Sequence, residues 1–295
     1  MERYRTLLFV PGIKKNWFEK VTSYQADGII LDLEDSVSIQ AKSEARQYVS
    51  KAIPVLASKG VNVFVRINKV HDGFDKDDLR SIVQAGLRGI VLPKIDGPEE
   101  IEQLTDIVKA LEEQKGLKTG DIGILPILET AKSMQFAYEI ACCDRVIGIA
   151  GLAAKNGDVA RALGYQWTSK GLETLYMRSK VVMAARAAGV IPYGGLWQDV
   201  HNLEGLRRSS EFNRQLGFDG ELILHPSNVS IVNEIYSPTK EDIAYYQGMV
   251  EAFELAERSG ETAIMYQGEH IDYAHVKTAK EVLANAQRLG LVIQK

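Results

Sequence analysis

The chain has 295 residues, of which 45% are apolar and 25% charged, which is typical of a soluble globular protein with one large α/β domain or two smaller ones. Its net charge of −4 excludes a broad electrostatic attraction to nucleic acid or to an anionic membrane, so we expect neither as a partner. No stretch is long and apolar enough to span a membrane, no signal peptide precedes the first strand-like run, and the only cysteines are the adjacent Cys142 and Cys143. These features together predict a cytoplasmic protein.

Eight short runs rich in Val, Ile and Leu recur along the chain, and segments with apolar residues at helical spacing lie between them. The runs are 6–10, 28–33, 61–67, 89–92, 122–128, 145–149, 189–192 and 221–224. Strands that alternate with helices indicate right-handed βαβ units and a parallel sheet, and eight such units are typical of a (β/α)8 TIM barrel. The alternative is an open doubly wound sheet, but the turn after the first run, Val10–Lys15, has a single glycine and lacks the dinucleotide-binding fingerprint.

The pattern changes after Pro238. Residues 240–259 and 274–289 have the periodicity of two long helices, and residues 260–272 between them are loop-like. We therefore expect a (β/α)8 catalytic domain over residues 1–236 and a C-terminal helical extension over residues 237–295, which would act as a lid or a subunit contact.

The second apolar run ends abruptly in acidic residues. The stretch Gly28–Val37 reads GIILDLEDSV and places Asp32, Glu34 and Asp35 at the end of a core strand. Burying an unpaired carboxylate costs a large free energy. Either the strand runs out into a solvated loop, or these carboxylates meet cations in a polar site at the mouth of a parallel sheet.

Polar residues also follow the other predicted strands. In a barrel all of these positions converge on the carboxyl-terminal face, where barrel enzymes hold their active sites, so the sequence favours the polar site over the solvated loop. The strand ends carry Arg66 and Asn68 after the third run, Lys94 after the fourth, Glu129 and Thr130 after the fifth, Asn156 and Asp158 after the sixth, and His225 after the eighth.

This grouping of residue types suits anion and metal chemistry. Mg²⁺ prefers one or two protein carboxylates together with substrate oxygens, and Glu129 and Asp158 are the best-placed pair. The guanidinium of Arg66 could form a fork with a carboxylate or stabilise an oxyanion. His225 precedes Pro226 and is better explained as a structural histidine than as a catalytic one.

Several motifs resemble the citrate lyase β-subunit family, which includes malyl-CoA and citramalyl-CoA lyases within the HpcH/HpaI aldolase superfamily. The resemblance covers nearly the whole chain in order and implies a (β/α)8 barrel with a C-terminal extension. The motifs that carry it are RTLLFVPG at 5–12, LDLEDSV at 31–37, VRIN at 65–68, LPK at 92–94, PILET at 126–130, GFDG at 217–220 and HP at 225–226.

The resemblance implies a carbon–carbon lyase or synthase that acts on acetyl-CoA, or a related thioester, and a 2-oxo acid such as glyoxylate or pyruvate. It implies Mg²⁺ as the cofactor with Glu129 and Asp158 as ligands, Arg66 and Asp272 as catalytic residues, and a homo-oligomer, a trimer or a hexamer. The expected substrate-binding residues are Arg5, Glu34, Asp35, Arg66 and Glu129. Asp272 belongs to Gly268–Asp272, and it is an equally good candidate for the N-cap of the helix that follows.

The chain departs from the family pattern in two places. Gly194 occupies a position where many relatives have an aspartate, and Lys155 lies three residues before the expected metal ligand Asp158. These departures leave the substrate open and argue against a plain citrate lyase β-subunit that works on an acyl-carrier protein. Two other functions stay open: a CoA-independent pyruvate-type aldolase on free hydroxy acids, and a CoA-ester-binding regulatory protein with weak catalysis.

Overall fold

A computed structural model of the chain describes residues 2–291. It divides into two compact units, Met1–Glu234 and Ile235–Lys295, and the expected boundary lies after residue 236. No helix within the described residues combines the length and the apolarity needed to cross a bilayer.

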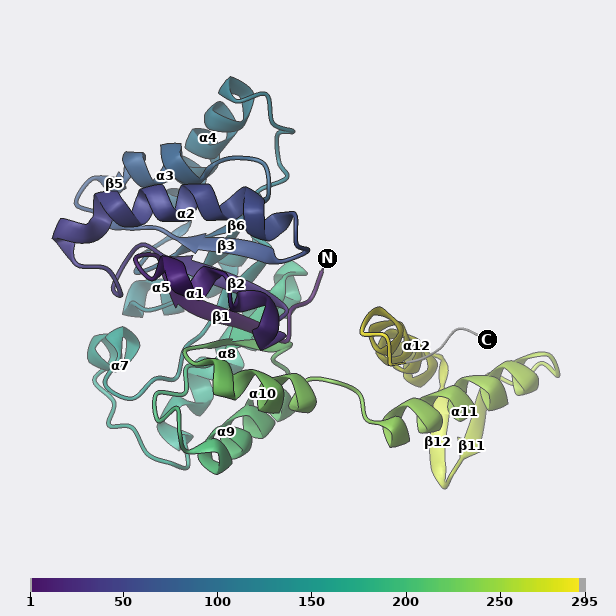
Figure 1. Ribbon diagram of the computed structural model, residues 1–295. Helices are drawn as coiled ribbons and strands as arrows, with labels where there is room; N and C mark the ends of the chain where they lie inside the picture. The colour runs from purple at the N-terminus through teal and green to yellow at the C-terminus, as the bar shows by residue number, and fades with distance from the viewer. Residues whose placement is uncertain (1, 292–295) are drawn as a thin grey trace. The chain divides into compact units, whose positions relative to one another are not determined.

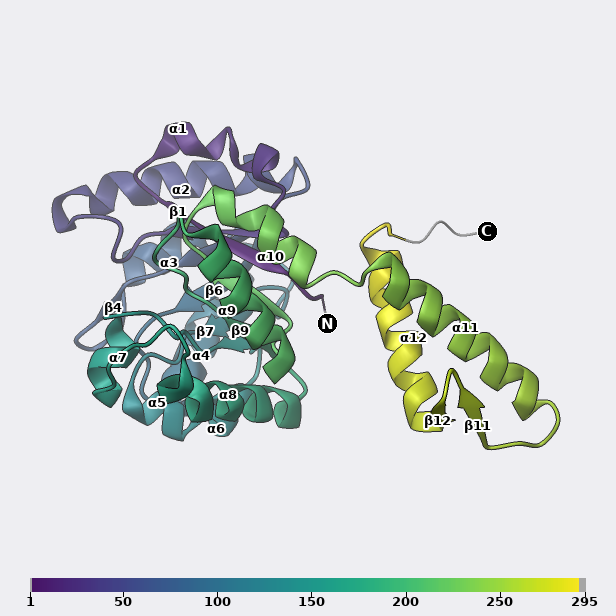
Figure 2. The ribbon, with the colours of Figure 1, turned by 90° about the horizontal axis from the view of Figure 1, so that it is seen from below.

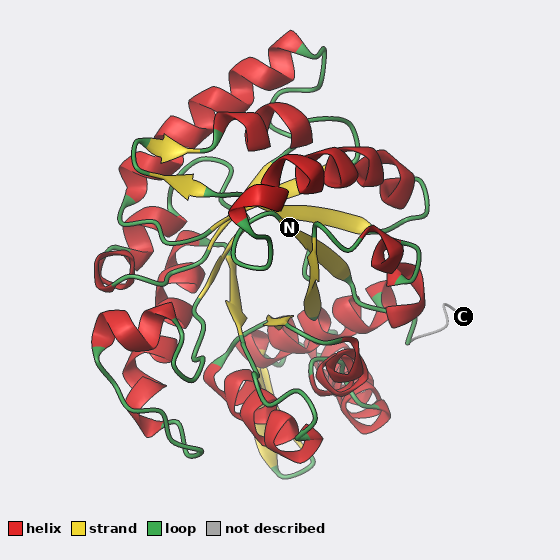
Figure 3. Cartoon of the chain, turned by 60° about the vertical axis from the view of Figure 1, so that its left-hand side comes forward, coloured by secondary structure: helices red, strands yellow, loops and turns green. Residues whose placement is uncertain are grey.

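The first unit is an α/β barrel, as the sequence predicts. Eight parallel strands form one sheet in the order β7-β6-β3-β2-β1-β10-β9-β8, and Figure 3 shows the ring of strands inside a ring of helices. The strands are β1 (Thr6–Pro11), β2 (Gly28–Asp32), β3 (Asn62–Arg66), β6 (Leu87–Leu92), β7 (Gly123–Pro126), β8 (Gly148–Ala150), β9 (Ile191–Gly194) and β10 (Gly220–Ile223).

Helices follow the strands on the outside of the ring (Figure 1). They are α1 (Lys15–Phe18), α2 (Lys42–Ala57), α3 (Lys76–Ile82), α4 (Pro98–Gln114), α5 (Ala131–Gln135), α6 (Ala137–Ala141), α7 (Asp158–Leu163), α8 (Leu175–Ala188), α9 (Leu203–Leu216) and α10 (Val229–Ile235). Short 3₁₀ turns lie at Val21–Tyr24, Ile39–Ala41, Leu172–Thr174 and Pro226–Asn228, and a small hairpin, β4 (Lys69–Val70) and β5 (Gly73–Phe74), follows β3.

Apolar side chains fill the interior of the barrel. Leu7, Ile30, Phe64, Val91 and Leu125 are fully buried there in one cluster, each from a different strand. Side chains of successive strand residues point to opposite faces, so these strands are apolar on both faces, which is why they read as continuous Val, Ile and Leu runs.

The ring closes between β7 and β8 by a short seam. Parallel bridges join Ile124 to Val146 and Ile127 to Ala150, and the amide of Ile124 donates to the carbonyl of Arg145 at 2.7 Å. A buried ion pair reinforces the amino-terminal side of this seam: Arg145 donates to the two carboxylate oxygens of Glu112 on α4 at 3.0 and 2.7 Å. The amide of Gly120 donates to the same carboxylate at 3.0 Å.

The second unit has its own core. Helices α11 (Lys240–Glu257) and α12 (Tyr273–Arg288) pack side by side (Figure 2) over a cluster of Met249, Phe253, Ile271, Val276 and Ala279. The two helices lie where the sequence predicts them.

The prediction of a loop at residues 260–272 is wrong. This segment forms an antiparallel hairpin of β11 (Ala263–Tyr266) and β12 (Glu269–Asp272). Gln267 and Gly268 form its two-residue turn with φ of 48° and 89°. Positive φ at both central positions is the geometry of a type I′ turn, whose twist suits a hairpin.

We expect Glu112→Gln to destabilise the barrel. The Glu112 side chain is fully buried, and the substitution leaves the buried Arg145 guanidinium without a counter-charge, so the free energy of unfolding should fall by about 3 kcal/mol. Urea unfolding followed by far-ultraviolet circular dichroism measures this change. Glu113→Gln removes an exposed carboxylate from the same helix and is the matched control; equal midpoints for the two variants would contradict the role of the pair.

Candidate active site

The carboxylates that follow β2 are each paired with a cation. The guanidinium of Arg66, at the end of β3, forms a fork with Asp32, with Nε–Oδ1 of 2.6 Å and Nη2–Oδ2 of 2.7 Å. Burial alone would raise the pKa of Asp32, but the hydrogen bonds and the charge of Arg66 hold it below its ordinary value. The amides of Glu34 and Ser36 also donate to this carboxylate, at 2.9 and 3.1 Å.

Register in the sheet explains why Arg66 and Asp32 meet. Asp32 lies opposite Arg66 in the parallel pairing of β2 with β3, so both side chains leave the sheet at the same level. Arg66 also reaches Glu34, with Nη1–Oε2 of 3.0 Å, and its guanidinium lies 4.8 Å from the centre of the Phe9 ring. Burial lowers the pKa of Arg66, but Asp32 and Glu34 together raise it above its ordinary value, so the group stays charged.

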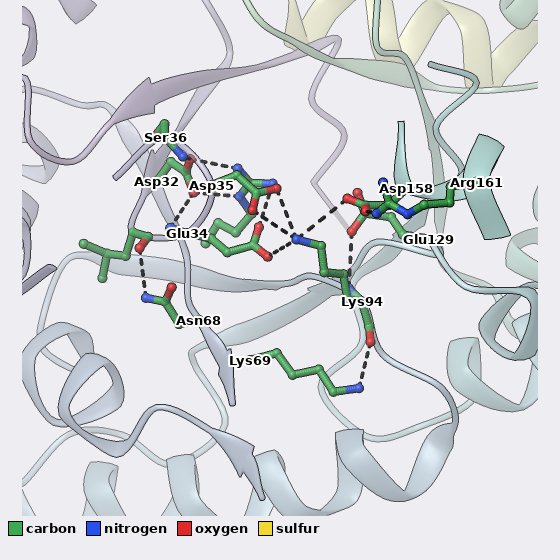
Figure 4. A network of polar contacts seen from close by, with 12 residues as sticks. Asp32, Glu34, Asp35, Ser36, Asn68, Lys69, Lys94, Glu129, Asp158 and Arg161 are labelled. Atoms are coloured by element: carbon green, nitrogen blue, oxygen red, sulfur yellow. Dashed lines mark hydrogen bonds and ion pairs between the residues drawn. The ribbon is translucent and has the colours of Figure 1, made fainter. Parts of the chain in front are cut away.

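Lys94 is the second cation of the site. Its Nζ lies 2.6 Å from Glu34, 3.0 Å from Asp35 and 3.7 Å from Asp158 (Figure 4). Burial lowers the pKa of Lys94, yet the carboxylates of Glu34 and Asp35 raise it above its ordinary value. One ammonium group therefore joins acids that come from two different parts of the barrel.

Glu129 is a second buried acid near Lys94. The backbone amide of Lys94 donates to Glu129 Oε2 at 3.2 Å, and the Glu129 side chain is only 9% exposed. Burial raises the pKa of Glu129 to about 7; the charge of Arg66 opposes this rise, while Glu34 and Asp158 add to it. Glu129 therefore lies in a position where a further cation would stabilise its ionised form.

Asp158 begins α7 and lies closer to solvent than Glu129. Arg161 on the next turn of the helix contacts the Asp158 carboxylate, and Lys94 Nζ lies near its other oxygen (Figure 4). Lys94 thus contacts Glu129 through its backbone and Asp158 through its side chain, which brings both expected metal ligands to one residue.

The donor set fits Mg²⁺ in chemistry and in number. Among residues 2–291 no group of three or more His, Cys, Asp or Glu could hold a metal ion by itself. Mg²⁺ commonly takes one or two protein carboxylates and completes its shell with water and substrate oxygens, so a pair of acids is enough. The residues that would hold the ion are Glu129 and Asp158.

One expected site residue of the barrel, Arg5, does not lie in this cluster. Arg5 precedes β1 and sits at the amino end of the barrel, where it is paired with Asp27 at 2.6 and 2.9 Å. The six residues of β1 span roughly 20 Å, so Arg5 lies about a strand's length from the carboxyl-end cluster, and its expected role in substrate binding stays a prediction. Asp272 belongs to the second unit.

Asp272 caps helix α12. Its carboxylate accepts from the amides of Ala274 and His275 at 2.9 and 3.4 Å, and His275 Nδ1 lies 2.7 Å away. The hydrogen bond with the His275 side chain holds the pKa of Asp272 below its ordinary value. The capping role expected from the sequence is therefore present, and the carboxylate is ionised at neutral pH.

Two lysines of the site, Lys94 and Lys42, had no role assigned from the sequence. Lys94 stands in the sequence motif LPK, and its left-handed backbone, with φ of 54°, turns its amide toward Glu129. Lys42, the first residue of α2, donates to the carbonyls of Leu33 and Glu34 at 2.6 Å and fixes the loop after β2. Lys42 follows the acidic stretch by only a few residues, but nothing in its local sequence distinguishes it from a surface lysine.

The comparisons with known proteins agree with this fold. The profile of the HpcH/HpaI aldolase/citrate lyase family matches residues 5–226. The citrate lyase subunit beta of Leuconostoc mesenteroides subsp. cremoris is 33% identical over 288 residues, which are 97% of this chain and 94% of that protein. The corresponding subunit of Escherichia coli (strain K12) is 30% identical over the same shares of the two chains.

A relative with a different activity and a solved structure extend the comparison. The (3S)-malyl-CoA thioesterase of Cereibacter sphaeroides (strain ATCC 17025 / ATH 2.4.3) is 29% identical over 97% of this chain and 96% of that protein. The crystal structure of CitE from Mycobacterium tuberculosis, in complex with magnesium, acetoacetate and coenzyme A, superposes with a TM-score of 0.74 at 26% identity and covers 97% of this chain and 98% of that chain.

The family match and the citrate lyase relatives show a carbon–carbon lyase. The chain belongs to the HpcH/HpaI aldolase/citrate lyase family.

We expect Glu129→Gln to stabilise the metal-free protein at pH 8. The pKa of Glu129 rises from an ordinary 4.5 to about 7 in the folded protein, so the folded state binds this proton more tightly than the unfolded state. The stabilisation from the bound proton is lost as pH rises through about 7, and a neutral amide avoids this loss. In EDTA the variant should be more stable by about 3 kcal/mol at pH 8, with the difference shrinking toward pH 5.

Thermal unfolding across pH 5–8 measures this difference, with Glu139→Gln, which alters an exposed acid on α6, as the control. Added Mg²⁺ should raise the midpoint of the wild-type protein and not that of Glu129→Gln, since a ligand that binds only the folded state stabilises it. A variant that is less stable than the wild type in EDTA at pH 8 would show that the protein itself compensates the negative charge of Glu129 without a metal.

Proposed function

We propose that this protein is a Mg²⁺-dependent lyase or synthase that cleaves or forms a carbon–carbon bond between an acetyl-CoA-type thioester and a 2-oxo acid. The observation that carries the proposal is the buried Glu129, with a pKa near 7, next to Asp158 and within the field of Arg66. Two acids that would share a cation suit a substrate with a carboxylate and a carbonyl. A nearby guanidinium that stays charged suits the same substrate. The CitE crystal structure is a complex with magnesium and coenzyme A, which supports the same assignment.

The residues of this chain have distinct roles in the proposed reaction. Glu129 and Asp158 would hold the ion, and Mg²⁺, when bound, would supply Lewis-acid polarisation of the 2-oxo acid carbonyl. Arg66 is held in place by its fork with Asp32, so its positive charge is ready to oppose negative charge that develops on an enolate or alkoxide oxygen.

Cleavage then requires one base. A base removes the proton of the substrate hydroxyl, and this oxygen becomes the carbonyl oxygen of the 2-oxo acid. The bond between the two carbons breaks at the same time, and the electron pair of that bond passes to the thioester, which leaves as an enolate. The enolate takes up a proton to give the acetyl thioester. In the direction of synthesis the same base removes a proton from the acetyl methyl group. Asp272 is the proposed base, because it is ionised and half-exposed.

The reaction is tested with a panel of CoA thioesters and 2-oxo acids, with and without Mg²⁺. We expect acetyl-CoA to exchange its methyl protons with deuterium and to condense with glyoxylate or pyruvate, and we expect EDTA to abolish both. Binding of acetyl-CoA with neither exchange nor condensation would leave only the CoA-ester-binding function. Turnover of free hydroxy acids in the absence of thioesters would indicate the CoA-independent aldolase.

The thioesterase among the relatives suggests one further measurement. Carbon–carbon cleavage releases acetyl-CoA and a 2-oxo acid in equal amounts and frees no thiol, whereas hydrolysis of the thioester frees CoA thiol. Counting free thiol and 2-oxo acid in the same reaction separates the two activities.

We expect Asp272→Asn to keep the fold and Mg²⁺ binding and to lose most turnover, by at least about 100-fold, the usual contribution of a general base. Asparagine caps helices as well as aspartate does, so a purely structural role predicts unchanged turnover. The measurement is kcat for condensation, together with circular dichroism of the variant. Unchanged kcat would remove Asp272 from the mechanism.

Mixing variants tests whether Asp272 serves another copy of the chain. In a homo-oligomer in which the base reaches a neighbouring barrel, a mixture of Asp272→Asn and Glu129→Gln proteins regains part of the activity that each has lost. A base that acts within its own chain gives no recovery.

A further inference from the structure

A cavity of about 370 Å³ lies outside the acid cluster. It is formed by the loops that follow β8 and β9, by the segment that leads into α8, and by one face of α9. Ligand pockets in proteins begin at about 300 Å³. Neither Glu129, Asp158 nor Arg66 lines this cavity, so the proposed reaction leaves it unexplained.

The cavity lies at the same end of the barrel as the candidate active site. Ala153, which follows β8, and Leu196, which follows β9, both line it, and the amide of Ala153 donates to the carbonyl of Gly195 at 2.7 Å. Lys155, another lining residue, precedes Asp158 by three residues, and three residues of extended chain span at most about 11 Å. A ligand that reaches Asp158 can therefore extend into this cavity.

Aromatic side chains form much of its wall. The rings of Trp167 and Trp197 lie 6.2 Å apart with an angle of 59° between their planes, and Phe212 lines the side formed by α9. Trp197 is fixed in place: its Nε1 donates to the carbonyls of Asp199 and Asn202 at 2.7 and 3.1 Å. The ring also packs over Gly205, where a Cβ would approach it to 2.5 Å. These contacts hold a flat apolar surface ready for a ligand.

The charged side chains of the wall are mostly positive. Four cations line the cavity against a single acid, Asp199; the cations are Lys155, Lys170, Arg178 and Arg208. Within residues 2–291 neither Lys155 nor Lys170 forms an ion pair, and Lys155 Nζ lies 5.9 Å from the centre of the Trp167 ring.

Arg178, another of these cations, forms a buried part of the wall. It donates to the carbonyl of Gly171 at 2.8 Å and to Asn213 at 3.0 Å, and its guanidinium lies 4.6 Å from the centre of the Phe212 ring. Arg178 is only 4% exposed, so the positive charge is built into the wall rather than carried on a mobile side chain.

We propose that this cavity receives the substituent of the 2-oxo acid, and that this substituent has an aromatic or other apolar body that ends in an anionic group. The inference rests on the proposed function, because it assigns the part of the same substrate that lies away from the reacting bond. Glyoxylate and pyruvate have no such substituent and leave the cavity unfilled. The tryptophans contact the body, and Lys155 and Lys170 approach the distal anion.

Three 2-oxo acids that differ in one feature at a time test the proposal: pyruvate, phenylpyruvate and phenylpyruvate with a carboxylate at the para position. Condensation with acetyl-CoA gives kcat/KM for each acid, and calorimetric titration in the presence of Mg²⁺ gives binding without turnover. We expect the wild-type protein to prefer the para-carboxylated acid over pyruvate by at least tenfold, with phenylpyruvate between them.

Two sets of variants separate the body from the charge. Leu196→Trp fills the cavity and Trp197→Ala removes a wall, and each should lower the ratio of kcat/KM for phenylpyruvate to that for pyruvate at least tenfold. Lys155→Met combined with Lys170→Met should lower only the ratio of the para-carboxylated acid to phenylpyruvate. Trp17→Ala, which removes an exposed tryptophan from α1, is the matched control and should change neither ratio.

The outcomes distinguish this inference from the proposed function. If pyruvate or glyoxylate reacts but the two aromatic acids neither bind nor react, the cavity proposal is overturned and the lyase function stands. If no 2-oxo acid reacts but the para-carboxylated acid binds and the variants weaken that binding, the cavity proposal stands and the reaction fails. Ratios that are the same in the cavity variants and in the control also overturn the cavity proposal.

Discussion

The candidate site depends on the compensation of buried carboxylates by two cations. Asp32 and Glu34 lie at the end of a fully buried strand, and either would be costly without a partner. The fork between Arg66 and Asp32 supplies charge and fixed geometry, and Lys94 joins Glu34 and Asp35 to Asp158. Burial raises the pKa of Glu34 as well as that of Glu129, but Glu34 has Arg66 and Lys94 as partners, whereas within residues 2–291 Glu129 forms no ion pair. The missing partner cation makes Glu129 a metal ligand rather than a structural acid in the proposed mechanism.

The sequence predicts the barrel because parallel strands buried on both faces leave a strong local signal. The eight Val, Ile and Leu runs correspond to the eight strands of the ring, and the long helices α11 and α12 lie close to their expected bounds. The hairpin at Ala263–Asp272 was missed because its strands have only four residues each and its turn is Gln-Gly, a weaker signal than Asn-Gly. Its stability comes from packing on α11 and α12, which local sequence does not report.

The sequence also indicates which end of the barrel carries the polar residues, but not which of them pair. Convergence of strand ends is a property of topology, so Arg66, Glu129 and Asp158 could be grouped before any coordinates. The pairs depend on sheet register and on side-chain reach, and for this reason the roles of Lys94 and Lys42 could not be predicted. Arg5 shows the opposite case: it precedes β1, so its position at the amino end could have been inferred from strand direction alone.

Different parts of the barrel form the acid cluster and the cavity. The acid cluster comes from the strand ends of β2, β3, β6 and β7 and from the start of α7, whereas the loop of residues 195–202 contributes to the aromatic cavity and supplies no acid or cation to the cluster. An exchange of this loop between homologous barrels therefore leaves the charge pairs of the reaction centre intact. If the cavity receives the substituent as proposed, such a chain can diversify its specificity by recombining one short segment, without rebuilding the residues that break the carbon–carbon bond.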